Sequence, residues 1–396
     1  MMIQRFSIAR FPRIEFGAGA IDKLPGIAAS FGNRALLISG AASLQQSHRW
    51  QTLTQGLRQA GIQWEHTTVN GEPSPELVDA AVSRFRDRRP DVVIAIGGGS
   101  VLDAGKAVAG LLCTGDPVMD YLEGVGPEKP YAGPAVPFIA APTTAGTGSE
   151  ATRNAVLSIQ GEHGFKKSFR DERLVPEYAV VDPDFLASCP PGQIAANGMD
   201  ALTQLMESYV STRASRMTDA LALDGMRAAR DSLMPLYEDP AEASDARAGM
   251  AYAALLSGIT LAQTGLGSVH GLASPLGAFF PIPHGVVCGT LVAAATRVNI
   301  EAMQAREPEN PALDKYARLA GLLCDTEFSE TQKAHEALIN LLEDRVRQLD
   351  IPRLGRFGVK ATDFTRIVAN SRGSSMKTNP VELTDDEVAA ILQQRL

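Results

Sequence analysis

The chain has 396 residues, of which 45% are hydrophobic and 21% charged, and its formal net charge is −8. This length exceeds what one simple core usually serves, so two domains are expected. The acidic balance argues against a nucleic-acid or anionic-membrane partner, because both need a basic surface.

The cysteines and the N-terminal stretch predict a cytoplasmic protein. Cys113, Cys189, Cys288 and Cys324 are widely spaced and form no CxxC pair, which is typical of reduced thiols rather than of a disulfide framework. The first residues carry no continuous apolar segment of the kind found in signal peptides. No run of eighteen apolar residues is long enough to span a membrane.

Up to about residue 184, short β-like runs alternate with segments of helical periodicity. The β-like runs are 35–40, 62–69, 91–99, 137–144 and 178–183, and helical stretches at 47–60, 75–88 and 101–113 lie between them. Nearly continuous apolar strands separated by helices predict a parallel sheet that is covered on both faces.

The residue pattern changes at Pro190 and Pro191. Helical segments rich in Ala, Leu and Met follow. They cover 200–212, 217–235, 243–263, 285–297 and 330–348. We therefore predict an α/β domain over 1–184 and an all-helical domain over 185–396, with a cleft between them. Residues 306–314 and 371–380 are expected to be loops.

The β-like run 91–99 ends in a glycine-rich turn. Gly97, Gly98, Gly99 and Ser100 stand between this strand and the next helix, where small residues let a phosphate approach the helix N-terminus. The spacing fits neither a Walker A loop nor G-x-G-x-x-G. A tight turn without a ligand is the alternative.

A second turn of this kind, 141–152, follows the next strand. It offers the hydroxyls of Thr143, Thr144, Thr147 and Ser149. Two such turns at the carboxyl ends of parallel strands suit a dinucleotide that lies across the sheet edge.

Candidate metal ligands lie in the helical part. Asp200 and Gln204 are four residues apart on a predicted helix and share one face. His270 and His284 stand in a glycine-rich apolar segment, where an imidazole needs a partner. The alternative is a pair of hydrogen-bonded core histidines. The other four histidines, His48, His66, His163 and His335, are expected at the surface.

These four candidates would suit Fe²⁺, Zn²⁺, Mn²⁺ or Co²⁺. A metal site of this kind with an open position polarises an alcohol or carbonyl oxygen. Together with a dinucleotide site, it predicts hydride transfer.

The chain resembles the iron-containing (group III) alcohol dehydrogenases, which have a dehydroquinate-synthase-like fold. The resemblance runs nearly end to end. It is carried by "FPRIEFGAGAIDKL", "GGGSVLDAGKAVA", "PTTAGTGSEAT", "VVDPDF", "GMDALTQLMESYVS", the "VHG…PHG" segment and "NPVELTDDE". It implies an NAD(P)-binding N-terminal domain and a catalytic divalent metal held by the helical domain.

The resemblance places the metal ligands at Asp200, Gln204, His270 and His284. The family usually has histidine where Gln204 stands, and a neutral amide oxygen is a weaker donor, so lower affinity or a harder ion is expected. Many members also have a histidine at Ser274 that relays protons. Serine does not titrate near neutrality, so a water chain or another residue must take over this part of the catalytic site.

On the cofactor side, the resemblance matches Gly97, Gly98, Gly99 and Ser100 to the pyrophosphate loop. Asp103 falls near the nicotinamide, Thr143, Thr144 and Thr147 fall in the second loop, and Lys166 or Lys167 contacts ribose or phosphate. Gly40 stands where NAD-preferring relatives often have Asp, and its lack of a carboxylate favours NADP. Alternatively, Gly40 is a simple turn glycine.

The resulting hypothesis is an NAD(P)-dependent, metal-assisted alcohol dehydrogenase or aldehyde reductase of small substrates. The metal is expected to be Fe²⁺ or Zn²⁺, and the protein a homodimer or larger homo-oligomer. One alternative is a metal-independent reductase similar to maleylacetate reductase, although Asp200 argues against it. Another is a nucleotide-binding relative in which Gln204 and Ser274 mark the loss of catalysis.

Overall fold

Six parallel strands form the main sheet, in the order β1-β8-β5-β4-β2-β3. The computed structural model describes residues 5–41 and 44–396. The strands are β1 (Arg13–Phe16), β2 (Arg34–Gly40), β3 (Gln63–Val69), β4 (Val92–Gly97), β5 (Phe138–Pro142) and β8 (Tyr178–Val181). The predicted parallel sheet is confirmed, and its central strands β4 and β5 are buried throughout.

Alternate residues of the central strands face two separate cores, as the two-residue period of a strand requires. Val93 and Ala95 of β4 pack toward α3 (Pro75–Phe85) and α4 (Gly99–Leu111). Ile94 and Ile96 pack on the other face, toward α1 (Leu24–Ala29) and α2 (His48–Gln59). Helices on both faces explain why these strands are apolar without interruption.

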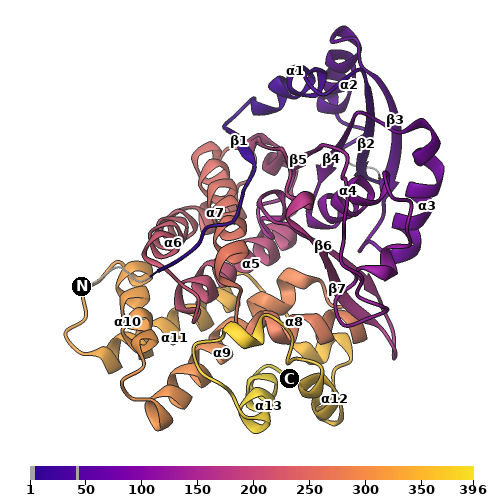
Figure 1. Cartoon of the computed structure of the whole chain (residues 1–396). Helices are drawn as coiled ribbons and strands as arrows, with labels where there is room; N and C mark the ends of the chain where they lie inside the picture. Colours follow the sequence, from indigo (N-terminus) through magenta and orange to yellow (C-terminus); the bar gives the residue numbers. More distant parts are fainter. Residues whose placement is uncertain (1–4, 42–43) are drawn as a thin grey trace.

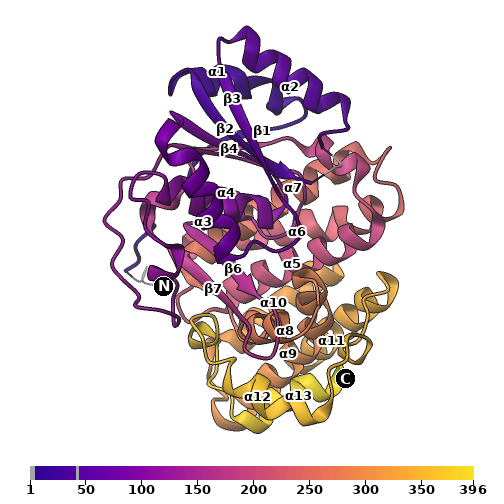
Figure 2. The same ribbon diagram turned by 90° about the vertical axis from the view of Figure 1, so that its right-hand side faces the viewer.

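A two-stranded antiparallel hairpin was not predicted from the sequence. It consists of β6 (Asn154–Ile159) and β7 (Phe165–Arg170). Its β6 strand contacts α4 and its β7 strand contacts α8, so the hairpin lies between the sheet and the helical part (Figures 1 and 2). Most side chains of β7 are only half-buried, which is why the pattern of an apolar strand is missing there.

The second half of the chain is helical in the part that the structure describes. Its helices are α5 (Pro191–Val210), α6 (Arg216–Glu238), α7 (Ser244–Thr264), α8 (Ser268–Phe279), α9 (His284–Arg306), α10 (Pro311–Cys324), α11 (Thr331–Gln348), α12 (Phe364–Ala369) and α13 (Asp385–Gln394). The predicted all-helical fold after the sheet is confirmed. In Figure 2, α12 and α13 lie at the end of the molecule farthest from α1 and α2.

Two expectations for this half were wrong in detail. The predicted loop 306–314 ends early, because Asn310 caps α10 through the backbone N–H of Ala312 and Pro311 occupies the first helical position. His335 is not at the surface. It lies on the buried face of α11, and its Nε2 is 2.8 Å from the carbonyl oxygen of Leu313.

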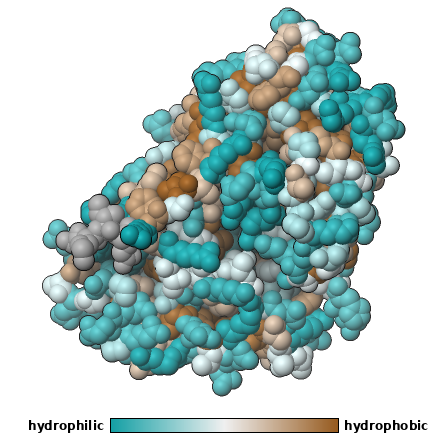
Figure 3. Space-filling view, in the orientation of Figure 1, coloured by the Kyte–Doolittle hydropathy of each residue, from teal (hydrophilic) through white to brown (hydrophobic). Residues whose placement is uncertain are grey.

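Among the described residues, one helix is long and apolar enough to cross a membrane. This helix is α9, and 89% of its most apolar 18-residue segment is buried inside the protein. An all-round apolar helix is what a central core position requires. Hydrophilic side chains cover most of the face shown in Figure 3, and the hydrophobic ones form small separate groups.

Two glycines bring the sheet and the helical part into close contact. A Cβ atom added to Gly148 would lie 2.4 Å from the Cα atom of Gly258 on α7. Gly148 also has a φ angle of 60°, which favours glycine. The turn 141–152 therefore packs directly on α7 and fixes one side of the space between the two parts.

Candidate metal and cofactor site

A cavity of about 1680 Å³ lies between the carboxyl edge of the sheet and the helices. Its lining includes most of the predicted site residues: Gly98, Gly99, Ser100, Asp103, Thr144, Thr147, Lys166, Lys167, Asp200, Gln204, His270, Ser274 and His284. Gly40, Gly97 and Thr143 are not part of the lining. One space thus connects the predicted phosphate loop to the predicted metal ligands.

Gly98 and Gly99 at the N-terminus of α4 line this cavity, so the backbone there is not covered by side chains. Gly98 is the N-cap residue and supplies no side-chain hydrogen bond. A Cβ atom on Gly99 would lie 2.7 Å from Oγ1 of Thr147, and one on Gly98 would lie 3.3 Å from Oγ1 of Thr144. The two turns are therefore in contact only because these positions are glycine. Free N–H groups at a helix N-terminus suit the phosphates of a dinucleotide.

A buried lysine holds the two turns together. The Lys106 side chain is fully buried, and its Nζ lies 3.0 Å from Oδ1 of Asp103, from the carbonyl oxygen of Ser149 and from Oγ1 of Thr152. Asp103 also accepts hydrogen bonds from the Ser149 hydroxyl and from the N–H of Val156. The Asp103 carboxylate, predicted to lie near the nicotinamide, thus also organises the second turn.

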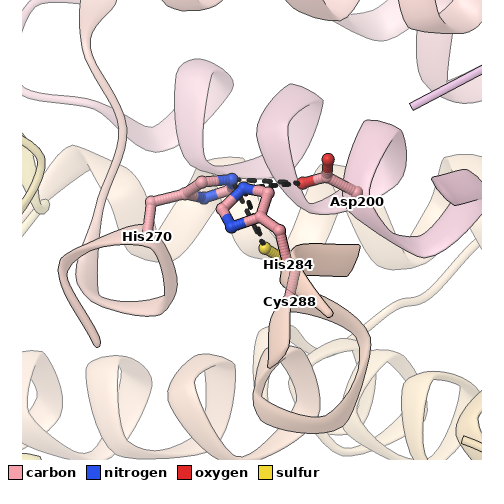
Figure 4. Close-up of side chains that lie close together, drawn as sticks. All are labelled: Asp200, His270, His284 and Cys288. Atoms are coloured by element: carbon pink, nitrogen blue, oxygen red, sulfur yellow. Dashed lines mark hydrogen bonds and ion pairs between the residues drawn. The ribbon is translucent and has the colours of Figure 1, made fainter. Parts of the chain in front are cut away.

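Four potential metal donors converge from three helices (Figure 4). Asp200 comes from α5, His270 from α8, and both His284 and Cys288 come from α9. Nε2 of His270 is 3.3 Å and Nε2 of His284 is 3.7 Å from Oδ1 of Asp200. Sγ of Cys288 is 3.5 Å from Nε2 of His270 and 3.8 Å from Nε2 of His284. These donors form a site that suits a divalent cation.

The four donors and their burial shift one another's pKa values. Burial opposes ionisation of Asp200, but the imidazoles of His284 and His270 outweigh it and lower the pKa of Asp200 to about 2. Burial lowers the pKa of His284 to about 4 and raises the pKa of Cys288 to about 12. For His270, burial is outweighed by Cys288, Glu207 and Asp200, and the pKa is well above its usual value. A metal ion at this place must therefore displace protons.

Glu207 orients His270 for this role. Its Oε2 is 2.6 Å from Nδ1 of His270, and its Oε1 accepts the N–H of Val269 at 2.7 Å. With Nδ1 engaged by a carboxylate, Nε2 is the ring nitrogen that points to the other donors.

Glu207 and Cys288 were not predicted as site residues from the sequence, although their spacing from Asp200 and His284 places them on the same helix faces. Glu207 stands seven residues after Asp200 on α5, and Cys288 stands four residues after His284 on α9. Both intervals return to the same helix face.

Gln204 and Ser274, the two positions where the resemblance predicts a departure from the family, both make hydrogen bonds. Oε1 of Gln204 accepts a hydrogen bond from the hydroxyl of Ser257 at 2.8 Å, and its Nε2 donates to Oδ1 of Asp200 at 3.1 Å. The hydroxyl of Ser274 donates to the carbonyl oxygen of Lys166 at 2.8 Å. The Nζ of Lys166 lies 2.7 Å from Oε1 of Glu72.

Comparison with known proteins identifies the family. The model of iron-containing alcohol dehydrogenases matches residues 12–183, and the model of their C-terminal region matches residues 194–396. Alcohol dehydrogenase 4 of Saccharomyces cerevisiae is 34% identical over 387 residues, which are 96% of this chain and 95% of that protein.

Two bacterial relatives are 29% identical to the chain. One is the NAD-dependent methanol dehydrogenase of Bacillus methanolicus, with 97% of this chain and 98% of that protein covered. The other is the NADPH-dependent butanol dehydrogenase of Clostridium saccharobutylicum, with 99% and 97% covered. The crystal structure of a 1,3-propanediol oxidoreductase matches with a TM-score of 0.89 at 29% identity, covering 99% of this chain and 100% of that one. The resemblance seen in the sequence is confirmed, and the chain belongs to the iron-containing alcohol dehydrogenase family.

Proposed function

We propose that the chain is a metal-assisted, NAD(P)-dependent alcohol dehydrogenase that also works as an aldehyde reductase on small substrates. Membership of the family makes it an oxidoreductase. The observation that carries the proposal is the single cavity, in which the bare N-terminus of α4 and the donors around Asp200 share one lining. A dinucleotide bound at the N-terminus of α4 would therefore share this cavity with a substrate held at the donors around Asp200.

Asp200, His270 and His284 would hold the metal, and Glu207 would keep Nε2 of His270 directed at it. When bound, a divalent ion polarises the substrate oxygen and the nicotinamide carries the hydride. The chain contributes binding, orientation and the exclusion of water by the cleft walls. Gln204 in place of a histidine marks a branch of the family, and Ser274 supplies no titrating group.

Removal of the metal tests this function. The protein is expected to oxidise short primary alcohols with NAD(P) after loading with Fe²⁺ or Zn²⁺, and to lose at least ~100-fold of its activity after chelation, since a Lewis acid contributes several kcal/mol. Steady-state absorbance of the reduced nicotinamide measures turnover, and reloading is the control. Equal activity of the chelated protein would support a metal-independent reductase instead.

The end of β2 supports a preference for NADP. Gly40 leaves this position without a carboxylate, and a Cβ atom added there would meet nothing within 4 Å. Its carbonyl oxygen accepts a hydrogen bond from Nε2 of Gln45. An aspartate at position 40 is therefore accommodated, and it would repel a 2′-phosphate. Relatives with either cofactor exist, so this residue is proposed as the determinant.

We accordingly expect Gly40→Asp to lower the ratio of kcat/KM with NADP to kcat/KM with NAD by at least ~10-fold, or about 1.4 kcal/mol. Gly40→Asn is the control, because it has the same shape without the charge. If both variants shift the ratio equally, the carboxylate is not the cause. If neither shifts it, the 2′-phosphate does not lie at this residue.

Other parts of the hypothesis remain proposals. The family models match 12–183 and 194–396, which supports the division into domains 1–184 and 185–396. We propose the remaining cofactor contacts at Gly97, Ser100, Thr143, Thr144, Thr147 and either Lys166 or Lys167. We also propose a cytoplasmic homodimer or larger homo-oligomer. The thiols of Cys113, Cys189, Cys288 and Cys324 are free.

A further inference from the structure

We infer that the fourth metal ligand in this chain is the thiolate of Cys288, and that Gln204 positions Asp200 without touching the metal. The inference rests on the metal-assisted function proposed above. It changes the expected ligand set from a carboxylate, an amide and two imidazoles to a carboxylate, a thiolate and two imidazoles.

The spacing of the four donors carries the first step. Around an ion bonded to nitrogen or oxygen at ~2.0–2.1 Å and to sulfur at ~2.3 Å, a tetrahedron has edges of roughly 3.3 Å between nitrogen and oxygen and roughly 3.5 Å between sulfur and nitrogen. The two imidazole–carboxylate distances are 3.3 and 3.7 Å. The two distances from Sγ of Cys288 to imidazole nitrogens are 3.5 and 3.8 Å. Four of the six edges of such a tetrahedron are thus matched to within about 0.4 Å, and all four donor atoms lie within 4.8 Å of one another.

Gln204 is turned the wrong way for a ligand. The Oδ1 atom of ionised Asp200 only accepts hydrogen bonds, so the amide group next to it must be the NH₂ of Gln204. The remaining Oε1 then faces the buried hydroxyl of Ser257 at 2.8 Å, and this hydroxyl shares its one proton between Oε1 and the carbonyl oxygen of Ala254, also at 2.8 Å. An NH₂ group has no free electron pair for a metal. The side chain instead fixes the carboxylate that binds the metal.

Helix geometry places Cys288 where it is needed. It follows His284 by one turn of α9, so both side chains project from the same face toward Asp200 (Figure 4). Cys288 is fully buried, and its only described hydrogen-bonding neighbours belong to this group.

A thiolate changes both the charge and the softness of the site. Asp200 and Cys288 together provide two negative charges, which balance those of a divalent ion. Thiolate ligands select Zn²⁺ over harder ions, and Co²⁺ also ranks above Fe²⁺ in affinity. We therefore expect this chain to retain Zn²⁺ or Co²⁺ more tightly than Fe²⁺.

Cobalt gives a readout that does not depend on activity. We expect the metal-free protein to bind one Co²⁺ per chain and to develop a thiolate-to-cobalt charge-transfer band in the near ultraviolet. Cys288→Ser should lose the band and bind Co²⁺ more than ~100-fold more weakly, because even an outer partner of a ligand is worth 10–100-fold. Cys113→Ser, at a cysteine outside the site, and Gln204→Leu should keep the band.

X-ray absorption at the cobalt edge of the unmutated protein removes any dependence on variant folding. One sulfur neighbour at ~2.3 Å is expected. Binding of Co²⁺ without a sulfur neighbour, or a band that survives in Cys288→Ser, would overturn this inference and leave the metal-assisted function intact. Failure of the protein to bind Co²⁺, Zn²⁺ or Fe²⁺ would overturn both.

Discussion

Asp200→Asn is expected to abolish metal binding and to lower kcat/KM for alcohol oxidation by at least ~100-fold. The carboxylate is 1% exposed and lies within 3.7 Å of both imidazole nitrogens that point into the group. Asparagine keeps the shape but removes the charge, so the attraction for a divalent ion is lost. The lost Lewis acid is worth several kcal/mol, and each 1.4 kcal/mol is tenfold in rate.

Metal per chain, measured by mass spectrometry, and steady-state kinetics test this expectation together. Asp219→Asn is the control, because Asp219 is a partly buried carboxylate that pairs with Lys315 at 2.9 Å but lies outside the cavity. It should keep both metal and activity. An Asp200→Asn protein that retains one metal ion and normal turnover would show that the carboxylate is not a ligand.

The same substitution has a consequence for the metal-free protein. The imidazoles hold the pKa of Asp200 at about 2, against burial, and this is below the value in an unfolded chain. A carboxylate with a depressed folded-state pKa stabilises the fold above its unfolded pKa and loses this effect as pH falls toward 2. Metal-free Asp200→Asn should therefore be less stable at neutral pH than metal-free protein with the carboxylate.

The sheet could be predicted from sequence because its determinants are local. A buried parallel strand is apolar at every position, as in 92–96, and the glycines that follow it mark the turn into a helix. The hairpin of β6 and β7 had no such pattern, because nearly all of β7 is half-buried and β6 mixes buried with half-buried positions. Its burial depends on contacts far away in the chain.

The candidate site could be predicted only in part for a similar reason. Asp200, His270 and His284 are unusual in their local surroundings, so the sequence drew attention to them. Cys288 looked like an ordinary small apolar residue of a core helix, which is the commonest role of a free cysteine. The direction of the Gln204 amide depends on Ser257, which lies 53 residues later in the chain. No local pattern contains that information.

Lys106→Met is expected to lower the free energy of unfolding by ~3–5 kcal/mol, the usual effect of breaking a buried ion pair. The ammonium group is fully buried, and burial is the main reason that the pKa of Lys106 is lowered. Methionine fills a similar volume but leaves the Asp103 carboxylate without its cation. Ser149 and Thr152 also lose the donor that ties the second turn to α4.

Lys315→Met is the control for this experiment. Lys315 also pairs with a carboxylate, Asp219, but its side chain is 22% exposed and that of Asp219 is 25% exposed, so its loss should cost less than the loss of the fully buried Lys106. Urea unfolding measures both variants, and fluorescence titration with NADPH measures the dinucleotide site. If Lys106→Met were as stable as the unchanged protein but bound NADPH weakly, Lys106 would act on the cofactor rather than on the fold. If Lys106→Met instead lowered both the free energy of unfolding and the affinity for NADPH, the conclusion would differ. The two glycine-lined turns would then form a phosphate site only while Lys106 holds them together.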